Sequence, residues 1–347
     1  MKSLLQGIKK LTRRKKTFKR FKTFLKNGKY FGDSRAKVFW LNKNRANEMF
    51  CSEHLKRSLP TSFLKRRMFQ VTVNSKDKVY DGEIIAFGNT ASDDIPASVK
   101  IFNLTRQEVV TVYLNATKMQ SDLQAYEFFK DKLPLVPMLS RELDRSMIKE
   151  KLILSKPIAK MNENEYLHLF ETIVRFYVRY FKSEQAGGTI TVDDLLNEAI
   201  DKGIDQYNLS KILSRLHNFQ NKDVILKVLH GDFTYSNLLL YEDCCYFIDF
   251  EHFGQYCFYY DIFWLMQNEY VYGQNKTLLT LYFNGQLDSI FEELFDSVGD
   301  CFDNSLRDIY YSVFLLEMFN KRIYNLKERE DVFNYLERIF CEFHIGV

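Results

Sequence analysis

The chain has 347 residues, of which 46% are hydrophobic and 27% are charged, and its formal net charge is +4. This composition excludes a collagen-like or an intrinsically disordered chain and allows a sizeable hydrophobic core. The six cysteines are dispersed and form no C-x-x-C pair, which disfavours a disulfide framework or a zinc site and is typical of a reduced, cytoplasmic protein. No apolar run reaches about 18 residues, so we expect neither a transmembrane helix nor a cleaved signal peptide.

The positive charge is concentrated at the N-terminus. Residues 1–30 contain 12 Lys or Arg and no Asp or Glu, which leaves 37 basic against 45 acidic residues in the remainder. Apolar residues recur in this segment at helical spacing, at Leu4, Ile8, Leu11, Phe18, Phe21 and Leu25. We predict an N-terminal extension, residues 1–35, whose amphipathic helix lies on an anionic membrane surface. Two alternatives stay open: a solvated basic tail, and a nucleic-acid-binding segment, which the apolar stripe disfavours.

The next part of the chain is predicted to be rich in strands. Runs of β-branched and aromatic residues occur at Met68–Val73, Val79–Phe87, Ala97–Asn103, Glu108–Asn115 and Ser146–Glu150. Between the last two, residues 117–131 have helical periodicity and are followed by Pro134. This order predicts a small β-rich lobe over residues 36–150.

The C-terminal part is predicted to be mostly helical. Helical patterns cover residues 163–184, 192–201, 206–219, 259–272, 274–284, 287–298, 303–326 and 330–344. Residues 151–347 are therefore expected to form a larger helical lobe, and the fold class is α+β with two lobes.

One stretch, residues 230–251, places polar residues at the ends of apolar runs. Asp232 follows the run that ends at Leu229, Asn237 comes five residues later, and Asp249 ends a second apolar run. Phosphoryl transfer needs a carboxylate that orients and deprotonates the acceptor hydroxyl, and oxygen ligands that hold Mg²⁺ against the phosphates. Protein kinases use an Asp, an Asn five residues on and a second Asp on the following hairpin. We therefore predict Asp232 as the catalytic residue and Asn237 and Asp249 as Mg²⁺ ligands.

The same stretch resembles a known superfamily. The sequence His-Gly-Asp-Phe-Thr-Tyr-Ser-Asn, the later Ile-Asp-Phe-Glu and the downstream Tyr260-Asp261 are similar to the motifs of the aminoglycoside phosphotransferase and choline kinase superfamily. The match covers roughly residues 225–266. The resemblance implies a protein-kinase-like fold, ATP as phosphoryl donor and a hydroxyl group as acceptor. It also implies that His230 props the catalytic loop, that Asp261 braces it from the next helix, and that Glu251 assists at the metal or the acceptor.

The nucleotide-binding residues of the β-rich lobe are less marked. The kinase fold expects a strand Lys that meets the phosphates and a helix Glu that pairs with it. Lys100 is the best candidate, Lys118 is its rival, and Glu127 is the expected partner. Glu150 and Leu152 lie in a segment that resembles the connector whose backbone binds adenine in this superfamily. The chain has no G-x-G-x-x-G motif, and residues 88–92 are a weak candidate for a loop over the phosphates.

The acceptor stays open at this point. The superfamily phosphorylates aminoglycosides, choline, sugars and cell-surface glycans, and a membrane-bound N-terminus favours a glycan or a lipid-linked sugar at the inner face of the membrane. A choline or amino-alcohol kinase is one alternative, because the 31 Phe and 21 Tyr could supply a cation–π cage. A catalytically inactive pseudokinase scaffold is the other.

Overall fold

The computed structural model describes residues 15–32, 38–41, 70–87, 97–156, 158, 161–184, 187–202, 216–242, 244–322 and 342–343. The chain divides into two compact units, each of which is treated by itself. Unit 1 contains residues 1–127, 134–159 and 238–248, and unit 2 contains residues 128–133, 160–237 and 249–347. Within the described residues, no helix combines the length and the hydropathy that spanning a membrane requires.

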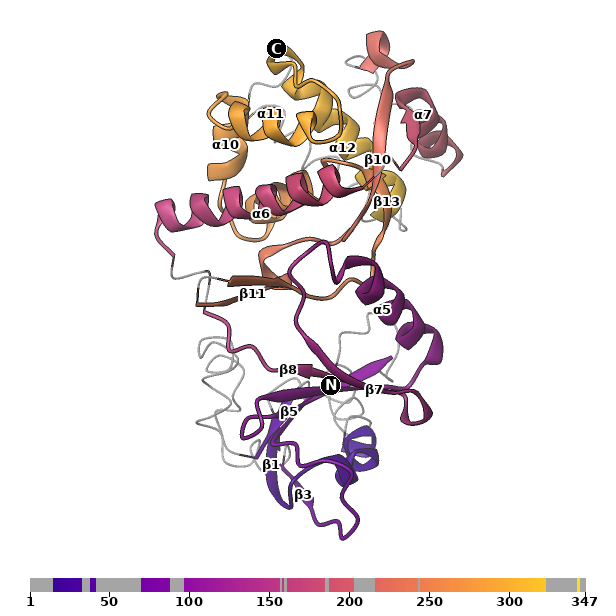
Figure 1. The fold of residues 1–347 in the computed structure, drawn as a ribbon, viewed down its shortest axis with the longest axis vertical. Helices are drawn as coiled ribbons and strands as arrows, with labels where there is room; N and C mark the ends of the chain where they lie inside the picture. Colours follow the sequence, from indigo (N-terminus) through magenta and orange to yellow (C-terminus); the bar gives the residue numbers. More distant parts are fainter. Residues whose placement is uncertain are drawn as a thin grey trace, which may run out of the picture. The chain divides into compact units, whose positions relative to one another are not determined.

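Unit 1 is built on an eight-stranded antiparallel sheet with the strand order β3-β1-β2-β4-β5-β6-β8-β7 (Figure 1). Its strands are β1 (Gly28–Gly32), β2 (Val38–Trp40), β3 (Gln70–Val73), β4 (Ile84–Phe87), β5 (Ser98–Asn103), β6 (Glu108–Tyr113), β7 (Met138–Glu142) and β8 (Met147–Lys151). Helix α5 (Ala116–Phe129) follows β6 and contributes Met119 and Leu123 to a small apolar cluster with Tyr113 and Ile148. The β-rich lobe predicted from the sequence is confirmed.

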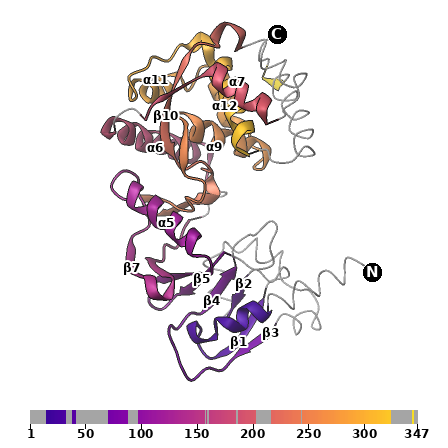
Figure 2. The ribbon, with the colours of Figure 1, turned by 90° about the vertical axis from the view of Figure 1, so that its right-hand side faces the viewer.

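The described part of the predicted N-terminal extension, residues 15–32, packs within this unit. Residues 15–20 form a helix that lies against β1 and β3 (Figure 2). Phe18, Phe21 and Leu25 are at most 3% exposed and pack in the main core of the sheet, and the Phe18 ring lies 5.0 Å from that of Phe39. The expected membrane-facing stripe is therefore wrong for these three residues, because the sheet already buries them. Leu4, Ile8 and Leu11 lie outside the described residues.

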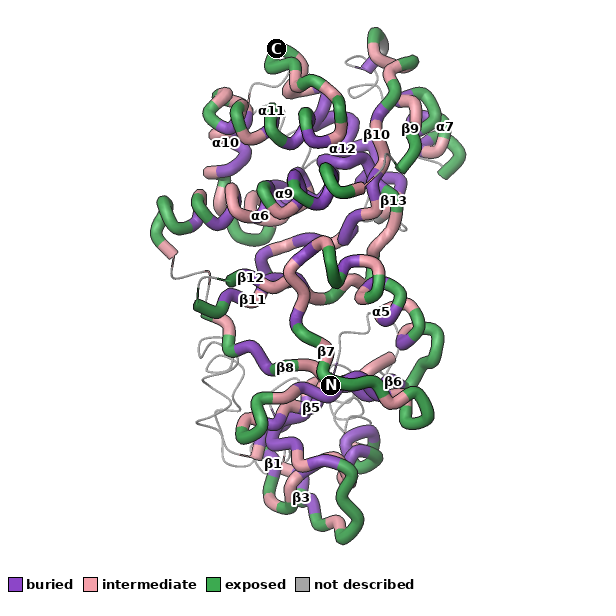
Figure 3. The backbone as a smooth tube through the Cα atoms, viewed as in Figure 1, coloured by how far each residue is buried: buried purple, intermediate pink, exposed green. Residues whose placement is uncertain are grey.

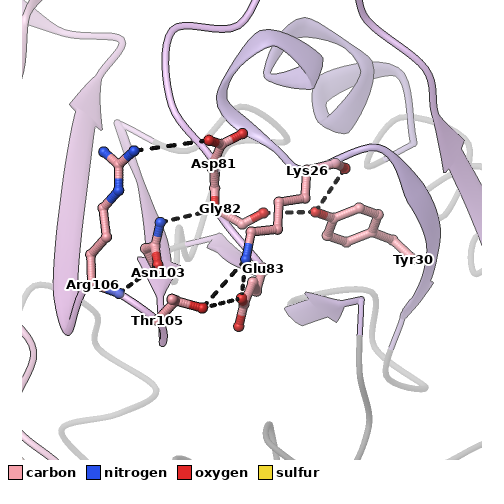
Figure 4. Close-up of polar contacts among 8 residues, drawn as sticks. All are labelled: Lys26, Tyr30, Asp81, Gly82, Glu83, Asn103, Thr105 and Arg106. Carbon is pink, nitrogen blue, oxygen red and sulfur yellow. Dashed lines mark hydrogen bonds and ion pairs between the residues drawn. The ribbon is translucent and has the colours of Figure 1, made fainter.

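Polar contacts fasten the same segment to the sheet (Figure 4). Lys26 forms an ion pair with the buried Glu83, and the Tyr30 hydroxyl donates a hydrogen bond to the Gly82 carbonyl at 2.7 Å. Burial, followed by the charge of Glu83, raises the pKa of Tyr30. A paired buried carboxylate favours one register of the segment on the sheet, since an unpaired one would be costly.

The hairpin that carries the second apolar run also groups with unit 1. Strands β11 (Leu238–Tyr241) and β12 (Cys244–Phe247) pair with each other, and the Lys156 amide donates to the Leu240 carbonyl at 2.7 Å. The expected boundary at residue 150 therefore differs from the observed division, since residues 151–159 and 238–248 group with the sheet. Cys244 is exposed and Cys245 buried, as the alternation of a strand predicts.

Unit 2 is mostly helical, with a small three-stranded sheet. Its helices are α6 (Glu163–Ser183), α7 (Val192–Asp201), α9 (Tyr260–Val271), α10 (Thr277–Phe283), α11 (Asp288–Asp296) and α12 (Arg307–Arg322). The sheet has the order β13-β10-β9, with β9 (Thr189–Thr191), β10 (Asp223–Leu229) and β13 (Gly254–Cys257). Side chains from Asn162 and Thr191 cap α6 and α7 as capping boxes. The predicted α+β fold with a β-rich and a helical part is confirmed.

The many aromatic residues of unit 2 are core residues. Many of them are at most 1% exposed, among them Phe263, Tyr282, Phe291, Phe295, Tyr311 and Phe314. Adjacent rings lie at edge-on or tilted angles, with centroids 4.7 Å apart for Tyr282 and Phe291. Buried positions (purple in Figure 3) run continuously along α12, where residues 309–320 are all buried, so packing of this core explains the high aromatic content.

We predict that Phe18→Ala lowers the free energy of unfolding of unit 1 by about 3–5 kcal/mol, because it opens a cavity in the core. Lys19→Ala, at an exposed neighbouring position, should change it by no more than about 0.5 kcal/mol. Chemical denaturation of the full-length variants measures both. Equal stability of the two variants would contradict the packing described for the N-terminal segment.

A second prediction concerns Glu317 of α12, which is 1% exposed and accepts the Cys257 amide hydrogen at 3.0 Å. Burial raises its pKa from 4.5 to about 7, against the lowering effect of the Cys257 hydrogen bonds and of Lys321. Between these two values the folded state keeps a proton that the unfolded state has lost, so stability falls as the pH rises through this window. Glu317→Gln should remove this dependence.

Relative to wild type, the Gln variant should therefore gain roughly 2–3 kcal/mol of stability between pH 5 and pH 8. Denaturant titrations of both proteins at the two pH values give the difference. Parallel pH dependences would show that Glu317 does not hold its proton in the folded state.

Candidate active site

The predicted catalytic loop follows the central strand of the unit 2 sheet. Strand β10 pairs with β9 on one side and with β13 on the other, and it ends at the fully buried Leu229. The chain then turns through His230, Gly231 and Asp232 and enters a short 3₁₀ helix, Tyr235–Asn237. A loop that directly follows the central strand of a sheet is anchored by that strand, so its side chains have little conformational freedom.

The loop is held by Asp261, which lies in the first turn of α9 and is 0% exposed. Its carboxylate accepts the His230 amide hydrogen at 2.8 Å and the Gly231 amide hydrogen at 2.9 Å, and the Tyr177 hydroxyl of α6 also donates to it at 2.7 Å. A carboxylate at a helix N-terminus is further favoured by the helix dipole. The expected brace from Asp261 is confirmed.

The backbone at Gly231 can be occupied only by glycine. Its φ is +77°, and a Cβ atom there would lie 2.3 Å from the His252 carbonyl oxygen and 2.5 Å from the Tyr256 hydroxyl. His230 beside it is 0% exposed, and its ring lies 4.4 Å from the ring of Phe250. Its Nδ1 accepts the Asp232 amide hydrogen at 3.3 Å, so His230 props the loop as the resemblance implies.

Asp232 is partly buried and is positioned through both its carboxylate and its main chain. The indole Nε1 of Trp264 donates to its Oδ1 at 3.2 Å, and the side-chain amide of Asn237 donates to its carbonyl oxygen at 2.8 Å. Trp264 is three residues after Asp261 on α9, so one helix both braces the loop and orients the carboxylate. The Asp-x4-Asn interval thus closes on itself through a hydrogen bond.

A second anchor holds the far side of the loop. The Tyr235 ring is buried and lies 5.1 Å from the Tyr166 ring, whose hydroxyl donates to the Glu269 carboxylate at 3.1 Å. Burial raises the pKa of Glu269, and the hydrogen bond from Tyr166 opposes that shift. The loop is therefore tied to α6 as well as to α9.

Asn237 and Asp249 have the chemistry of a magnesium site. Asn237 comes directly before β11, and Asp249 comes two residues after β12. Because Leu238 is paired with Phe247, both residues lie at the open end of this hairpin. The Asn237 side-chain nitrogen donates to the Asp232 carbonyl, so the side-chain oxygen is the atom that can bind a metal ion. The Asp249 side chain is exposed, and its backbone has a φ of +69°. One carboxylate and one amide oxygen suit Mg²⁺, which takes few protein ligands and completes its shell with phosphates and water.

Positive φ at a residue other than glycine is uncommon and costs about 1 kcal/mol or more, so Asp249 is held there by its surroundings. Such strain is found at functional sites, which agrees with the predicted role. Among the residues that the structure describes, no group of three or more His, Cys, Asp or Glu side chains could hold a metal ion by itself. The Glu251 Oε1 atom lies 3.7 Å from Nε2 of His252, and both side chains are exposed.

The predicted residues of the β-rich unit are only partly brought together. Burial raises the pKa of Glu150, and the charge of Lys100 opposes that shift. Glu127 forms an ion pair with Arg141 at 3.6 Å, and its expected pairing with Lys100 stays a prediction. The Leu152 amide donates to the Gln107 carbonyl at 2.8 Å, so a contact of Leu152 with adenine would have to use its carbonyl oxygen. The weak phosphate-loop candidate, residues 88–92, lies outside the described residues.

Several site residues were not singled out from the sequence. Trp264, Tyr177, Tyr166, Tyr235 and Glu269 hold the loop, yet in the sequence they look like ordinary helix and core positions. Trp264 had a usable signal, since it lies three positions after Asp261 and therefore on the same face of the helix. Glu269 and Tyr166 are 103 residues apart, and no local pattern joins them.

Comparison with known proteins gives matches among solved structures alone: no family model matches the chain, and no curated protein does. Choline kinase LicA from Streptococcus pneumoniae has 13% identity and a TM-score of 0.45, with 72% of this chain and 92% of that chain covered. Amicoumacin kinase hAmiN has 12% identity and a TM-score of 0.46, with 75% and 91% covered. Aminoglycoside phosphotransferase APH(3'')-Id from Streptomyces rimosus has 15% identity and a TM-score of 0.37, with 63% and 88% covered.

We predict that Asp261→Asn destabilises unit 2 by about 2–4 kcal/mol and removes any activity of the loop, because an amide cannot accept from both backbone N–H groups. Tyr177→Phe, which removes one donor to the same carboxylate, should cost only about 1 kcal/mol. Denaturation curves and amide hydrogen exchange at His230 and Gly231 measure the two effects. An Asn variant with wild-type exchange at these amides would contradict the brace.

Proposed function

We propose that this protein is a phosphotransferase that moves the γ-phosphoryl group of ATP to a hydroxyl group of a small molecule or a glycan. The observation that carries the proposal is the closed loop from His230 to Asn237, in which Asp261, Trp264 and Asn237 hold Asp232 in place. This arrangement supports catalysis by positioning, which is the main contribution of the protein in phosphoryl transfer.

In the proposed reaction Asp232 accepts a hydrogen bond from the acceptor hydroxyl and takes its proton. The acceptor oxygen forms a bond to the γ-phosphorus as the bond from that phosphorus to the β–γ bridging oxygen breaks, and ADP leaves. The carboxylate needs to be ionised and correctly oriented. The Trp264 indole supports the orientation by bonding one of the two carboxylate oxygens.

Asn237 and Asp249 would hold Mg²⁺, which neutralises the charge that develops on the phosphates when it is bound. Their oxygen donors fit this ion better than zinc or copper, which prefer nitrogen or sulfur ligands. The strained backbone of Asp249 is consistent with a side chain that is held for a ligand.

A water-soluble acceptor now has the same support as a lipid-linked one. The apolar stripe that favoured a membrane-bound acceptor is buried at Phe18, Phe21 and Leu25. Lys16, Lys19 and Arg20 remain exposed, so the described part of the N-terminal segment can attract an anionic surface by charge alone, which salt weakens. Choline stays an alternative acceptor, although the rings of the unit 2 core, such as Phe263 and Tyr282, are too buried to form a cage.

We predict a division of roles between the two aspartates. Asp232→Asn should lower kcat by about 10²–10⁴-fold and leave the affinity for Mg-ATP within about 3-fold, because the general base is lost while the metal ligands stay. Asp249→Asn, in which the new residue tolerates positive φ, should weaken Mg-ATP binding by at least about 10-fold. Calorimetry and a coupled ADP assay measure both.

The matched control is Glu242→Gln, which also removes an exposed carboxylate at positive φ, here +54°, and should leave binding and turnover unchanged. If wild type binds Mg-ATP and transfers no phosphoryl group to any of a panel of sugar, aminoglycoside, choline and glycolipid acceptors, a pseudokinase is indicated. If the Asp232 variant keeps wild-type turnover, the catalytic role is refuted.

A further inference from the structure

The strand that precedes α5 lacks the lysine that a kinase-like site requires. In protein kinases the phosphate-binding Lys lies on the third strand of the small lobe and pairs with a Glu of the next helix. Here the strands β4, β5 and β6 precede α5 in the chain, so β6 corresponds to the third kinase strand. Its sequence is Glu-Val-Val-Thr-Val-Tyr, without a lysine. A nucleotide site on this sheet must therefore take its lysine from elsewhere.

The register of the sheet supplies a lysine at an equivalent place. Lys100 of β5 is paired with Thr111 of β6, and directly opposed residues point to the same face with Cβ atoms about 4.5–5.5 Å apart. Along β5 the neighbours Val99 and Ile101 are buried in the core on the other face, while Lys100 is only partly buried. A lysine side chain is long enough to cover one strand spacing, so Lys100 reaches the region above Thr111.

The same face carries a carboxylate for this lysine. Glu150 of β8 is paired with Val109 of β6, two residues from Thr111, which places it on the face of Lys100. Burial raises the pKa of Glu150, the charge of Lys100 lowers it, and the charge of Asp122 raises it further. Lys100 and Glu150 therefore lie on the same face of the sheet, on either side of β6.

The rival lysine is occupied on the helix. Lys118 forms an ion pair with Asp122 one turn on, at 2.9 Å, and the Tyr113 hydroxyl donates to the same carboxylate at 2.9 Å. Asp122 accepts from Tyr113 of β6, and Glu127 pairs with Arg141 of β7, so each of these two acidic residues of α5 already has a partner on the sheet.

We propose that Lys100, from the strand beside the usual one, is the phosphate-binding lysine of this protein, with Glu150 as the carboxylate on the same face of the sheet. Lys118 then has no contact with the nucleotide and keeps Asp122 in place on α5. The inference rests on the proposed function, since it names the residue that meets the phosphates of the ATP.

Three single variants of the full chain test the assignment: Lys100→Met, Lys118→Met and Lys149→Met. Lys149 is the matched control, because it is the β8 neighbour of Glu150 and lies on the opposite face, 5.9 Å from the Tyr80 ring. Calorimetry with Mg-ATP and turnover of any accepted hydroxyl substrate are measured for each. We expect Lys100→Met to lower kcat/KM by at least about 100-fold, and the other two to stay within about 3-fold.

A transplanted lysine gives the sharper result. Thr111→Lys in the Lys100→Met background should recover at least 10-fold of the lost kcat/KM, because it returns the charge to the same face from the adjoining strand. Melting curves show whether the buried Thr111 site accepts the change, and if it does not, the comparison of Lys100→Met with Lys118→Met decides the matter. An unchanged Lys100→Met, or an equal loss in Lys118→Met, overturns the assignment.

The two failures can be told apart. A wild-type protein that binds no Mg-ATP overturns the proposed function together with this inference. A wild-type protein that binds Mg-ATP without transferring phosphate overturns the transferase alone, and the binding data for the Lys100 variant still test the lysine.

Discussion

The arrangement of the catalytic loop depends on one buried carboxylate. Asp261 is removed from solvent at the start of α9, where it accepts two consecutive backbone N–H groups and a tyrosine hydroxyl. Burying a carboxylate is costly unless its acceptor sites are filled, and the loop backbone fills them only in the observed conformation. Folding of α9 against the loop therefore selects that conformation, and Gly231 is needed because its φ is positive and no Cβ atom would fit.

Helix α9 also orients the side chain of Asp232, the proposed catalytic residue. Trp264, one turn after Asp261, bonds the Asp232 carboxylate, while Asn237 returns to the Asp232 carbonyl and closes the loop. Tyr235 is held separately through Tyr166 and Glu269. Two helices thus hold a loop of eight residues, which leaves Asp232 little freedom and makes positioning the source of any rate gain.

The sequence predicted those parts of the site that are encoded locally. The intervals between Asp232, Asn237 and Asp249, and the Tyr260-Asp261 pair, each fall on one loop, hairpin or helix turn, and the structure gives the predicted brace. The helices of unit 2 and most strands of unit 1 also follow from their apolar periodicity. The contacts of Asp122 with Tyr113 and of Glu127 with Arg141 of β7 could not be predicted from the sequence, because tertiary packing of α5 on the sheet decides both. The stripe of Phe18, Phe21 and Leu25 was read as membrane-facing because an apolar helix face looks the same whether lipid or a sheet covers it.

The central claim is that Asp232 acts on the acceptor while Asn237 and Asp249 hold the metal. A crystal of the full-length protein grown with Mn²⁺ and a non-hydrolysable ATP analogue tests this most directly through the anomalous signal of manganese. The account predicts a metal peak bonded to the Asn237 side-chain oxygen, the Asp249 carboxylate and the phosphates, at roughly 2.0–2.2 Å for a site built for Mg²⁺, with Asp232 outside the coordination shell. A metal bound by Asp232, or a nucleotide held without Asn237 and Asp249, would contradict it.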